Sequence, residues 1–150
     1  MARKLTPSEA MLKLLSQYIG LQEIPGIQHN ETILQWFHDI GYEWVRDDET
    51  SWCSCVINWV ALQLDIERSM RLDARSWMGV GDQPNFPMPG DVVIYWRENI
   101  NSWKGHVGLY MGFTIDKKGI YTLGGNQGNE INITVYPFDR LLGIRSLKYL

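Results

Sequence analysis

Several features are scarce in this sequence of 150 residues, and each scarcity excludes a class of protein. The two cysteines are too few for a disulfide-rich scaffold. Fourteen Lys and Arg side chains against seventeen Asp and Glu give a net charge of −3. No basic excess is therefore available to bind a phosphate backbone, and nucleic acid is not an expected partner. No apolar run approaches the roughly 20 residues that a membrane-spanning helix needs, so no membrane span is expected.

Metal ligands are also scarce. The three histidines, at positions 29, 38 and 106, include no pair with the i, i+4 spacing of a helical zinc site. The Cys-x-Cys pair at 53 and 55 lacks the second cysteine pair that a structural zinc site requires. Two positions apart on a helix, these thiols would point about 200° apart and could not form a disulfide. We expect no metal and no other cofactor.

The composition is that of a globular domain. Hydrophobic residues make up 45% of the chain and charged residues 21%, which are ordinary values for a folded protein. A chain of this length fits one domain over residues 1–150. Seven Trp and seven Tyr are many for this length. Most of these rings are expected in the core, although such flat faces with a polar edge also suit sugar rings.

Helical signals fill the first half of the chain. A capping box at 6–9, with Pro7 at the first helical position, begins the first apolar stripe, which closes at Gly20. Asn30 is a good N-cap for a second stripe that ends at Gly41. A third segment is apolar almost all round, which predicts a central, buried helix. The expected helices cover residues 7–20, 31–41, 52–64 and 74–78.

The second half changes to the alternation that is typical of β-strands. Strands are expected over residues 92–96, 105–113, 120–123, 131–135 and 143–147. In the second of these, Val107 and Leu109 take one face while His106 and Gly108 take the other. Helices followed by an antiparallel meander predict an α+β domain.

Cys53 falls in the first turn of the expected central helix, with Thr50 or Ser51 as its natural cap. Unpaired backbone N–H groups and the positive end of the helix dipole favour a thiolate at this position. These features make Cys53 a candidate nucleophile. Cys55 would point the other way, into the core, as a structural thiol.

His106 is the candidate general base. A turn centred near residues 116–118 pairs the two flanking strands so that His106 lies opposite the sequence Asn-Gln-Gly-Asn at 126–129. A side-chain amide there would hold the imidazole in one tautomer, and we assign that role to Asn126. The predicted mechanism has Cys53 attacking a carbonyl while His106 carries the proton. Backbone N–H groups of the first helical turn would form part of the oxyanion hole.

Four motifs in this order resemble those of the CHAP and NlpC-like cysteine peptidases, which are papain-like bacterial cell-wall hydrolases. They are Asp-Glu-Thr-Ser-Trp-Cys-Ser at 48–54, Pro-Gly-Asp-Val-Val at 89–93, Gly-His-Val-Gly at 105–108 and Leu-Gly-Gly-Asn-Gln at 123–127. The segment 20–26, followed by His29 and Asn30, also resembles the N-terminal region of a compact subgroup. The resemblance runs from about residue 8 to Arg145.

The resemblance implies a papain-like fold, with the catalytic cysteine at a helix N-terminus packed on an antiparallel sheet. It assigns Cys53 as nucleophile, His106 as base and Asn126 as the third polar residue. The third position varies among His, Asn, Gln and Glu in these families, so Gln127 and Asn129 are open alternatives. Many relatives carry Ala and then a nonpolar residue after the nucleophile, whereas this chain has serine and a second cysteine.

Three further residues are candidates for substrate binding. Trp52 stands beside the thiol and could stack on a sugar ring. Gln127 and Asp48 lie within the motifs that carry the resemblance. The simplest interpretation of the acidic residues at 47–49 is that they precede the expected helix, where their negative charge is favoured by the positive end of the helix dipole.

Together with the candidate Cys53–His106 pair, the resemblance implies a peptidoglycan hydrolase that cleaves an amide of the stem peptide or the muramoyl–alanine link. Such a protein, a phage endolysin or a secreted effector, would be a monomer made in the cytoplasm without a signal peptide. It would act on the cell wall or in the periplasm after release or secretion, with peptidoglycan as partner and an inhibitor or immunity protein as a further candidate. The alternatives are a Cys-His acyltransferase or deamidase, and a non-catalytic wall-binding module of the same fold.

Overall fold

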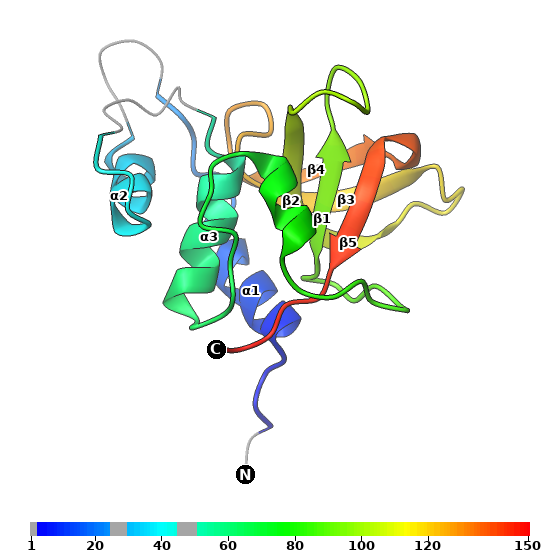
Figure 1. Ribbon diagram of the computed structural model, residues 1–150, viewed down its shortest axis with the longest axis horizontal. Coiled ribbons are helices and arrows are strands. Elements are labelled where there is room, and N and C mark those ends of the chain that lie inside the picture. The colour runs from blue at the N-terminus through cyan, green and yellow to red at the C-terminus, as the bar shows by residue number, and fades with distance from the viewer. Residues whose placement is uncertain (1–2, 25–29, 45–50) are drawn as a thin grey trace.

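One antiparallel sheet and a group of helices on one side of it form the two layers of the protein (Figure 1). The computed structural model describes residues 3–24, 30–44 and 51–150. The helices are α1 (Pro7–Ser16), α2 (Glu31–Asp39), α3 (Cys53–Gln63) and the 3₁₀ helices η1 (Ala74–Gly79) and η2 (Phe138–Arg140). The strands are β1 (Val92–Trp96), β2 (Gly105–Phe113), β3 (Gly119–Gly124), β4 (Asn132–Pro137) and β5 (Leu141–Arg145). Across the described residues, no helix is long and apolar enough to cross a bilayer.

Helix α1 begins where the capping box predicted and ends earlier than expected. The Thr6 hydroxyl accepts the N–H of Glu9 at 3.2 Å, and the Glu9 carboxylate accepts the N–H of Thr6 at 3.0 Å. The helix stops at Ser16 rather than at Gly20. Gly20 adopts a φ of +99° and donates its N–H to the carbonyl of Ile131 at 2.8 Å. This bond directs the chain away from the helix axis toward the sheet.

Helix α3 is the centre of the core, as its apolar sequence predicted. All of its residues from Cys53 to Ala61 are buried. We expected Thr50 or Ser51 to cap this helix, but Thr50 lies outside the described residues and the N-cap position is held by Trp52. No side chain makes a capping hydrogen bond there. The first turn is instead fixed from the side, because the Trp77 indole donates to the Ser54 hydroxyl at 3.0 Å.

The sheet has the strand order β4-β3-β2-β1-β5, with every neighbouring pair antiparallel. Val107 and Leu109 of β2 face the main core, which contains α3. The opposite side of the sheet holds a smaller apolar cluster that includes Tyr95 and Tyr110. The α+β prediction is therefore confirmed, and β2 alternates as expected up to an irregularity between Tyr110 and Gly112.

Candidate active site

Cys53 is the first residue of α3 and lines a cavity of about 360 Å³ beside β2. The thiol contacts the backbone N–H of Val107, the residue that follows His106. Figure 1 shows why these elements meet: α3 begins at the same end of the molecule as the loop that joins β1 to β2. Arg97, from the start of that loop, lines the same cavity.

Burial determines the protonation of Cys53. The side chain is only 2% exposed, and the loss of solvating water raises the pKa of the thiol above its ordinary value. The Val107 N–H, the Arg97 charge, Ser51 and the Ser54 N–H each favour the thiolate, but together they are weaker than the effect of burial. The helix terminus led us to expect a preformed thiolate. The thiol is instead neutral at rest.

Cys55 lies in the core, as expected from its position on the helix. It is fully buried, and burial raises the pKa of its thiol well above the ordinary value. Among the described residues, both cysteines are free thiols.

His106 is completely buried, and Gln127 fixes its orientation. The imidazole Nε2 lies 2.9 Å from the Gln127 Oε1. The Gln127 amide nitrogen donates to the carbonyl of Thr122 at 3.2 Å and to the carbonyl and Oδ1 of Asn132 at 2.8 and 2.9 Å. With its amino group committed, the Gln127 amide presents an oxygen to the ring, so Nε2 carries the proton and Nδ1 keeps a lone pair.

The Nδ1 atom of His106 contacts Arg97. The guanidinium Nη2 lies 3.2 Å from this nitrogen. Tyr136 stacks on the imidazole with ring centroids 4.8 Å apart, and Tyr95 stacks in turn on Tyr136 at 4.6 Å. The imidazole is thus held by an amide at one nitrogen, a guanidinium at the other and a phenol ring on one face.

The imidazole is neutral at physiological pH. Burial lowers the pKa of His106 to about 3, and the nearby Arg97 charge lowers it further, whereas the hydrogen bond to Gln127 opposes this shift. A neutral thiol and a neutral imidazole therefore coexist in the resting site. This pair differs from a preformed thiolate–imidazolium ion pair.

The lowered pKa of His106 predicts a loss of stability as the solution becomes acidic. Between pH 6.5 and about 3 the unfolded chain binds a proton at this residue and the native protein does not. The free energy of unfolding should therefore fall by about 1.4 kcal/mol per pH unit from this residue alone. Urea titrations at pH 5.5 and 4.5 measure the slope, because the unfolded histidine is then almost fully protonated and the native one is not. The His106→Gln variant should show a flatter slope by that amount, and equal slopes would contradict the prediction.

Asn126 does not reach the imidazole. Leu109 pairs with Leu123 and Tyr110 with Thr122, and continuing this register would place Asn126 opposite His106. However, β3 ends at Gly124, and Asn126 adopts a φ of +59°. The turn carries its amide to the Ser51 hydroxyl, at 3.4 Å, and brings the Gln127 amide to the Nε2 edge of the imidazole. The orienting amide is therefore the Gln127 alternative, while Asn129 is exposed.

Trp52 presents no surface to a sugar ring. Its side chain is fully buried, and its indole N–H donates to the Glu23 carboxylate at 3.2 Å. The glycine loop packs directly on it: a Cβ on Gly125 would lie 2.6 Å from the indole Cζ3. Gln127, with 3% exposure, contacts His106 rather than the cavity. Asp48, the third substrate-binding candidate, lies outside the described residues.

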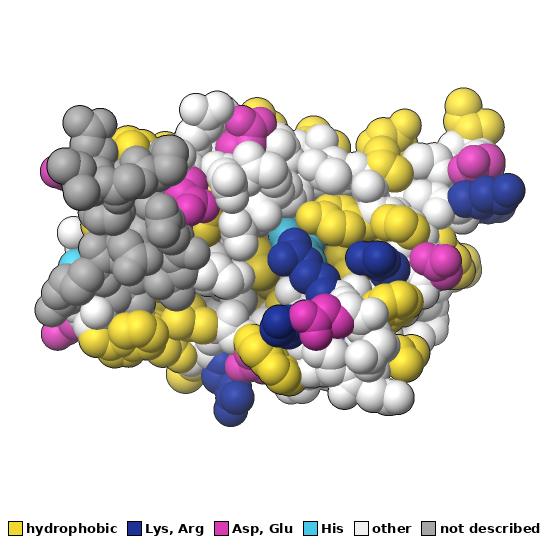
Figure 2. Space-filling model, turned by 90° about the horizontal axis from the view of Figure 1, so that it is seen from above, with side chains coloured by type: hydrophobic (Ala, Val, Ile, Leu, Met, Phe, Trp, Pro, Cys, Tyr) yellow, Lys and Arg dark blue, Asp and Glu magenta, His cyan; other side chains and the backbone are white. Residues whose placement is uncertain are grey.

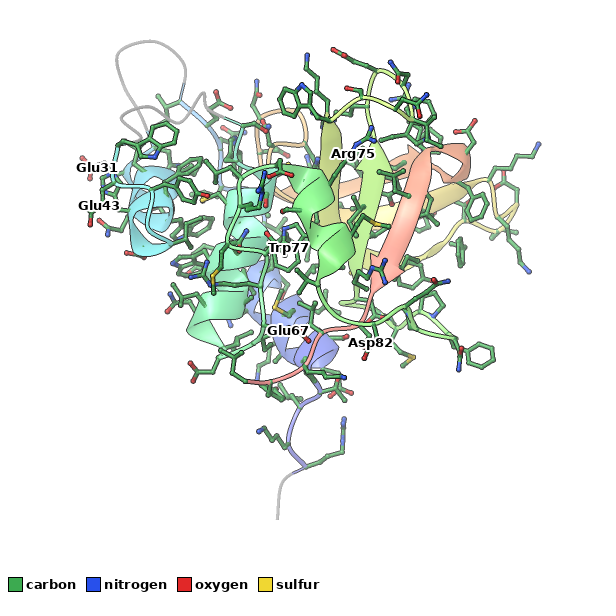
Figure 3. All side chains as sticks on the ribbon, viewed as in Figure 1. Glu31, Glu43, Glu67, Arg75, Trp77 and Asp82 are labelled. Atoms are coloured by element: carbon green, nitrogen blue, oxygen red, sulfur yellow. The ribbon has the colours of Figure 1, made fainter. Side chains whose placement is uncertain are left out.

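The sequence analysis did not single out Arg97 and Lys104, which form the open part of the site. They line the cavity together with Trp103, which is 72% exposed. Arg75 holds their loop, donating to the carbonyls of Asn99, Ile100 and Lys104 at 2.7 to 3.0 Å (Figure 3). In Figure 2, Lys and Arg side chains gather near the middle of one face, beside hydrophobic side chains. The signal available in the sequence was the β1–β2 hairpin, which returns the residue after β1 to the start of β2.

Within the described ranges, no three His, Cys, Asp or Glu side chains come together as possible ligands. A thiol and a guanidinium line the cavity, and the guanidinium contacts the buried imidazole of His106.

Solved structures of NlpC proteins resemble this fold. No family model and no curated protein matches the chain. NlpC1 from Trichomonas vaginalis is 18% identical with a TM-score of 0.57, over 99% of this chain and 47% of that one. NlpC2 from the same organism is 16% identical with a TM-score of 0.57, over 99% and 50%. This chain thus spans about half the length of either neighbour. At this identity the likeness concerns the fold alone, and the chain has an NlpC-like, papain-type α+β fold.

Proposed function

We propose that this domain is a cysteine-dependent hydrolase that cleaves an amide bond of peptidoglycan, in the stem peptide or at the muramoyl–alanine link. One observation carries the proposal: Gln127 accepts the Nε2–H of His106, which leaves Nδ1 as the basic nitrogen on the side of Arg97, a residue that lines the same cavity as Cys53. The NlpC-like fold supports the choice of cell-wall peptides as substrate. A phage endolysin or a secreted effector is the biological role that we propose for it.

In the proposed reaction the Cys53 sulfur attacks the amide carbonyl and a carbon–sulfur bond forms. The thiol proton passes to the His106 Nδ1 as the sulfur attacks. The carbon–nitrogen bond then breaks, and the amine leaves with the proton from the imidazolium. A water molecule, deprotonated by the same nitrogen, hydrolyses the thioester and regenerates the thiol. Backbone N–H groups at the start of α3 stabilise the oxyanion.

Digestion of purified peptidoglycan tests this proposal. The protein should release soluble fragments whose new amine and carboxyl termini, identified by mass spectrometry, appear in equal number. Fragments that carry an added amine in place of the carboxyl terminus would indicate acyl transfer instead. Intact peptidoglycan after incubation with folded protein, from walls of several chemistries, would contradict the proposed hydrolase.

Gln127 is a positioning residue in this mechanism, because it contacts the base and not the substrate. Replacing Gln127 by Ala should lower kcat by about 10- to 100-fold, the range typical of residues that orient a functional histidine. Because KM depends on the cavity, it should change little. The ¹⁵N chemical shifts of His106 should show that the single Nε2–H tautomer has been lost.

The matched control for this variant is Asn126→Gly. It removes the neighbouring amide and keeps the left-handed backbone conformation, which glycine adopts freely. Its kcat and its imidazole shifts should remain close to those of the wild type. A larger loss in Asn126→Gly than in Gln127→Ala would return the orienting role to Asn126.

A further inference from the structure

Arg97 lies beside the reactive groups as a half-buried cation. Its guanidinium contacts the His106 Nδ1 at 3.2 Å and hydrogen-bonds to the Tyr136 hydroxyl. No carboxylate among the described residues forms an ion pair with it. A guanidinium has five N–H donors and binds carboxylates through two parallel hydrogen bonds, so Arg97 retains unused capacity on the cavity side.

The other charges around the cavity are already paired. The Lys104 ammonium lies 2.7 Å from the Glu98 carboxylate, and Asp73 lies 2.7 Å from the Arg71 guanidinium. Arg97 is therefore the cavity-lining charge that no described carboxylate neutralises. Leu72 and Ala74 add apolar surface to the same cavity.

The contact between Arg97 and His106 conflicts with catalysis by this base. Arg97 only donates hydrogen bonds, so in the resting site it occupies the lone pair of Nδ1. The proposed reaction needs that lone pair to receive the thiol proton. The guanidinium must therefore move to another acceptor before Cys53 can be deprotonated.

We propose that Arg97 is the anchor for a carboxylate of the substrate, and that this carboxylate draws the guanidinium away from the His106 Nδ1. The inference rests on the proposed function, because it assumes that Cys53 attacks a substrate in this cavity. It specifies the substrate class: a peptide amide with a free carboxylate close to the scissile bond and a small apolar group against Leu72 and Ala74. A substrate without the carboxylate leaves Arg97 on the base.

Alkylation of Cys53 by iodoacetate and iodoacetamide tests the anchor without any cell-wall substrate. In both reactions a sulfur–carbon bond forms, iodide leaves and the thiol proton is lost to the imidazole or water. The reagents differ in having a carboxylate or a carboxamide. In a Cys55→Ala background, the ratio of the alkylation rate with iodoacetate to that with iodoacetamide should be about tenfold higher than the same ratio for N-acetylcysteine. A tenfold difference is the selectivity expected from one charge-assisted hydrogen bond.

Arg97→Gln should reduce this ratio to the N-acetylcysteine value. Arg97→Lys keeps the charge but cannot form two parallel hydrogen bonds, so its ratio should be intermediate. Arg3→Gln removes an exposed arginine of the N-terminal segment and should leave the ratio unchanged. A wild-type ratio equal to that of N-acetylcysteine, or the same ratio in wild type and Arg97→Gln, would overturn the inference. Melting curves confirm that each variant is folded before rates are compared.

A pair of peptide substrates tests whether the Arg97 anchor contributes to turnover. Two peptides that differ only in a carboxylate or carboxamide beside the scissile amide should differ in kcat/KM by about tenfold or more in the wild type. In Arg97→Gln that preference should disappear, and equal preference in both proteins would reject the anchor. If alkylation shows the charge selectivity while peptidoglycan stays intact, the hydrolase proposal fails and the anion site stands.

Discussion

Replacing Cys53 by serine is expected to lower the rate of peptidoglycan digestion by about 10⁴-fold or more, as loss of a nucleophile does in other hydrolases. A serine hydroxyl has a far higher pKa than a thiol, so its proton is far harder to transfer to the same imidazole, and the neutral hydroxyl is a weak nucleophile. The side chains have nearly the same shape, so the variant should keep its fold and its melting temperature. The release of new amine termini measures the effect.

Cys55→Ala is the matched control, because it removes the neighbouring thiol from the same helix. Cys55 is fully buried, so this variant should lose some stability while its turnover is retained. Loss of turnover in folded Cys55→Ala, with turnover kept in Cys53→Ser, would reverse the assignment of the two cysteines. Equal release by wild type and Cys53→Ser would rule out a thiol mechanism.

Replacing His106 by glutamine is expected to lower kcat by about 10²- to 10⁴-fold, the range for loss of a general base. Glutamine can still donate to the Gln127 Oε1, but it offers no nitrogen that accepts the thiol proton at neutral pH. The remaining activity should rise steeply with pH, since the thiolate must then form by direct ionisation. Burial raises the pKa of the Cys53 thiol, which places that rise at alkaline pH.

Rates of peptidoglycan digestion by the wild type and the His106→Gln variant, measured from pH 6 to 10, check this prediction. The wild type should retain its activity near neutral pH, where a base is available within the site. A variant whose pH profile runs parallel to that of the wild type would show that His106 does not carry the proton. Near-ultraviolet circular dichroism verifies that the stacking around Tyr136 has not collapsed in the variant.

Local patterns determined most of the fold, which is why the sequence predicted it. The capping box at Thr6 and the apolar alternation of 105–113 are both short-range signals, and both appear in the structure. The end of α1 was predicted wrongly because Gly20 bonds to Ile131, more than a hundred residues away. A contact between residues so far apart along the chain produces no periodic pattern in the sequence.

The site was predictable where one element sets the position and not where several elements meet. Cys53 followed from a helix start, and His106 from strand alternation. The exchange of Asn126 for Gln127 depended on a left-handed turn that the strand register could not show. The neutral thiol and the guanidinium of Arg97 on Nδ1 arise from tertiary burial and from a hairpin loop held by Arg75.

The fixed amide of Gln127 also determines which nitrogen of His106 can exchange protons with the substrate. The nitrogen of this amide donates to three oxygens, so the amide cannot flip to present an N–H group to Nε2, and Nε2 keeps its proton. Under the proposed mechanism, a single imidazole atom must therefore take the proton from sulfur and later deliver it to nitrogen. The departing amine must therefore leave Nδ1 before the water that hydrolyses the thioester can take its place.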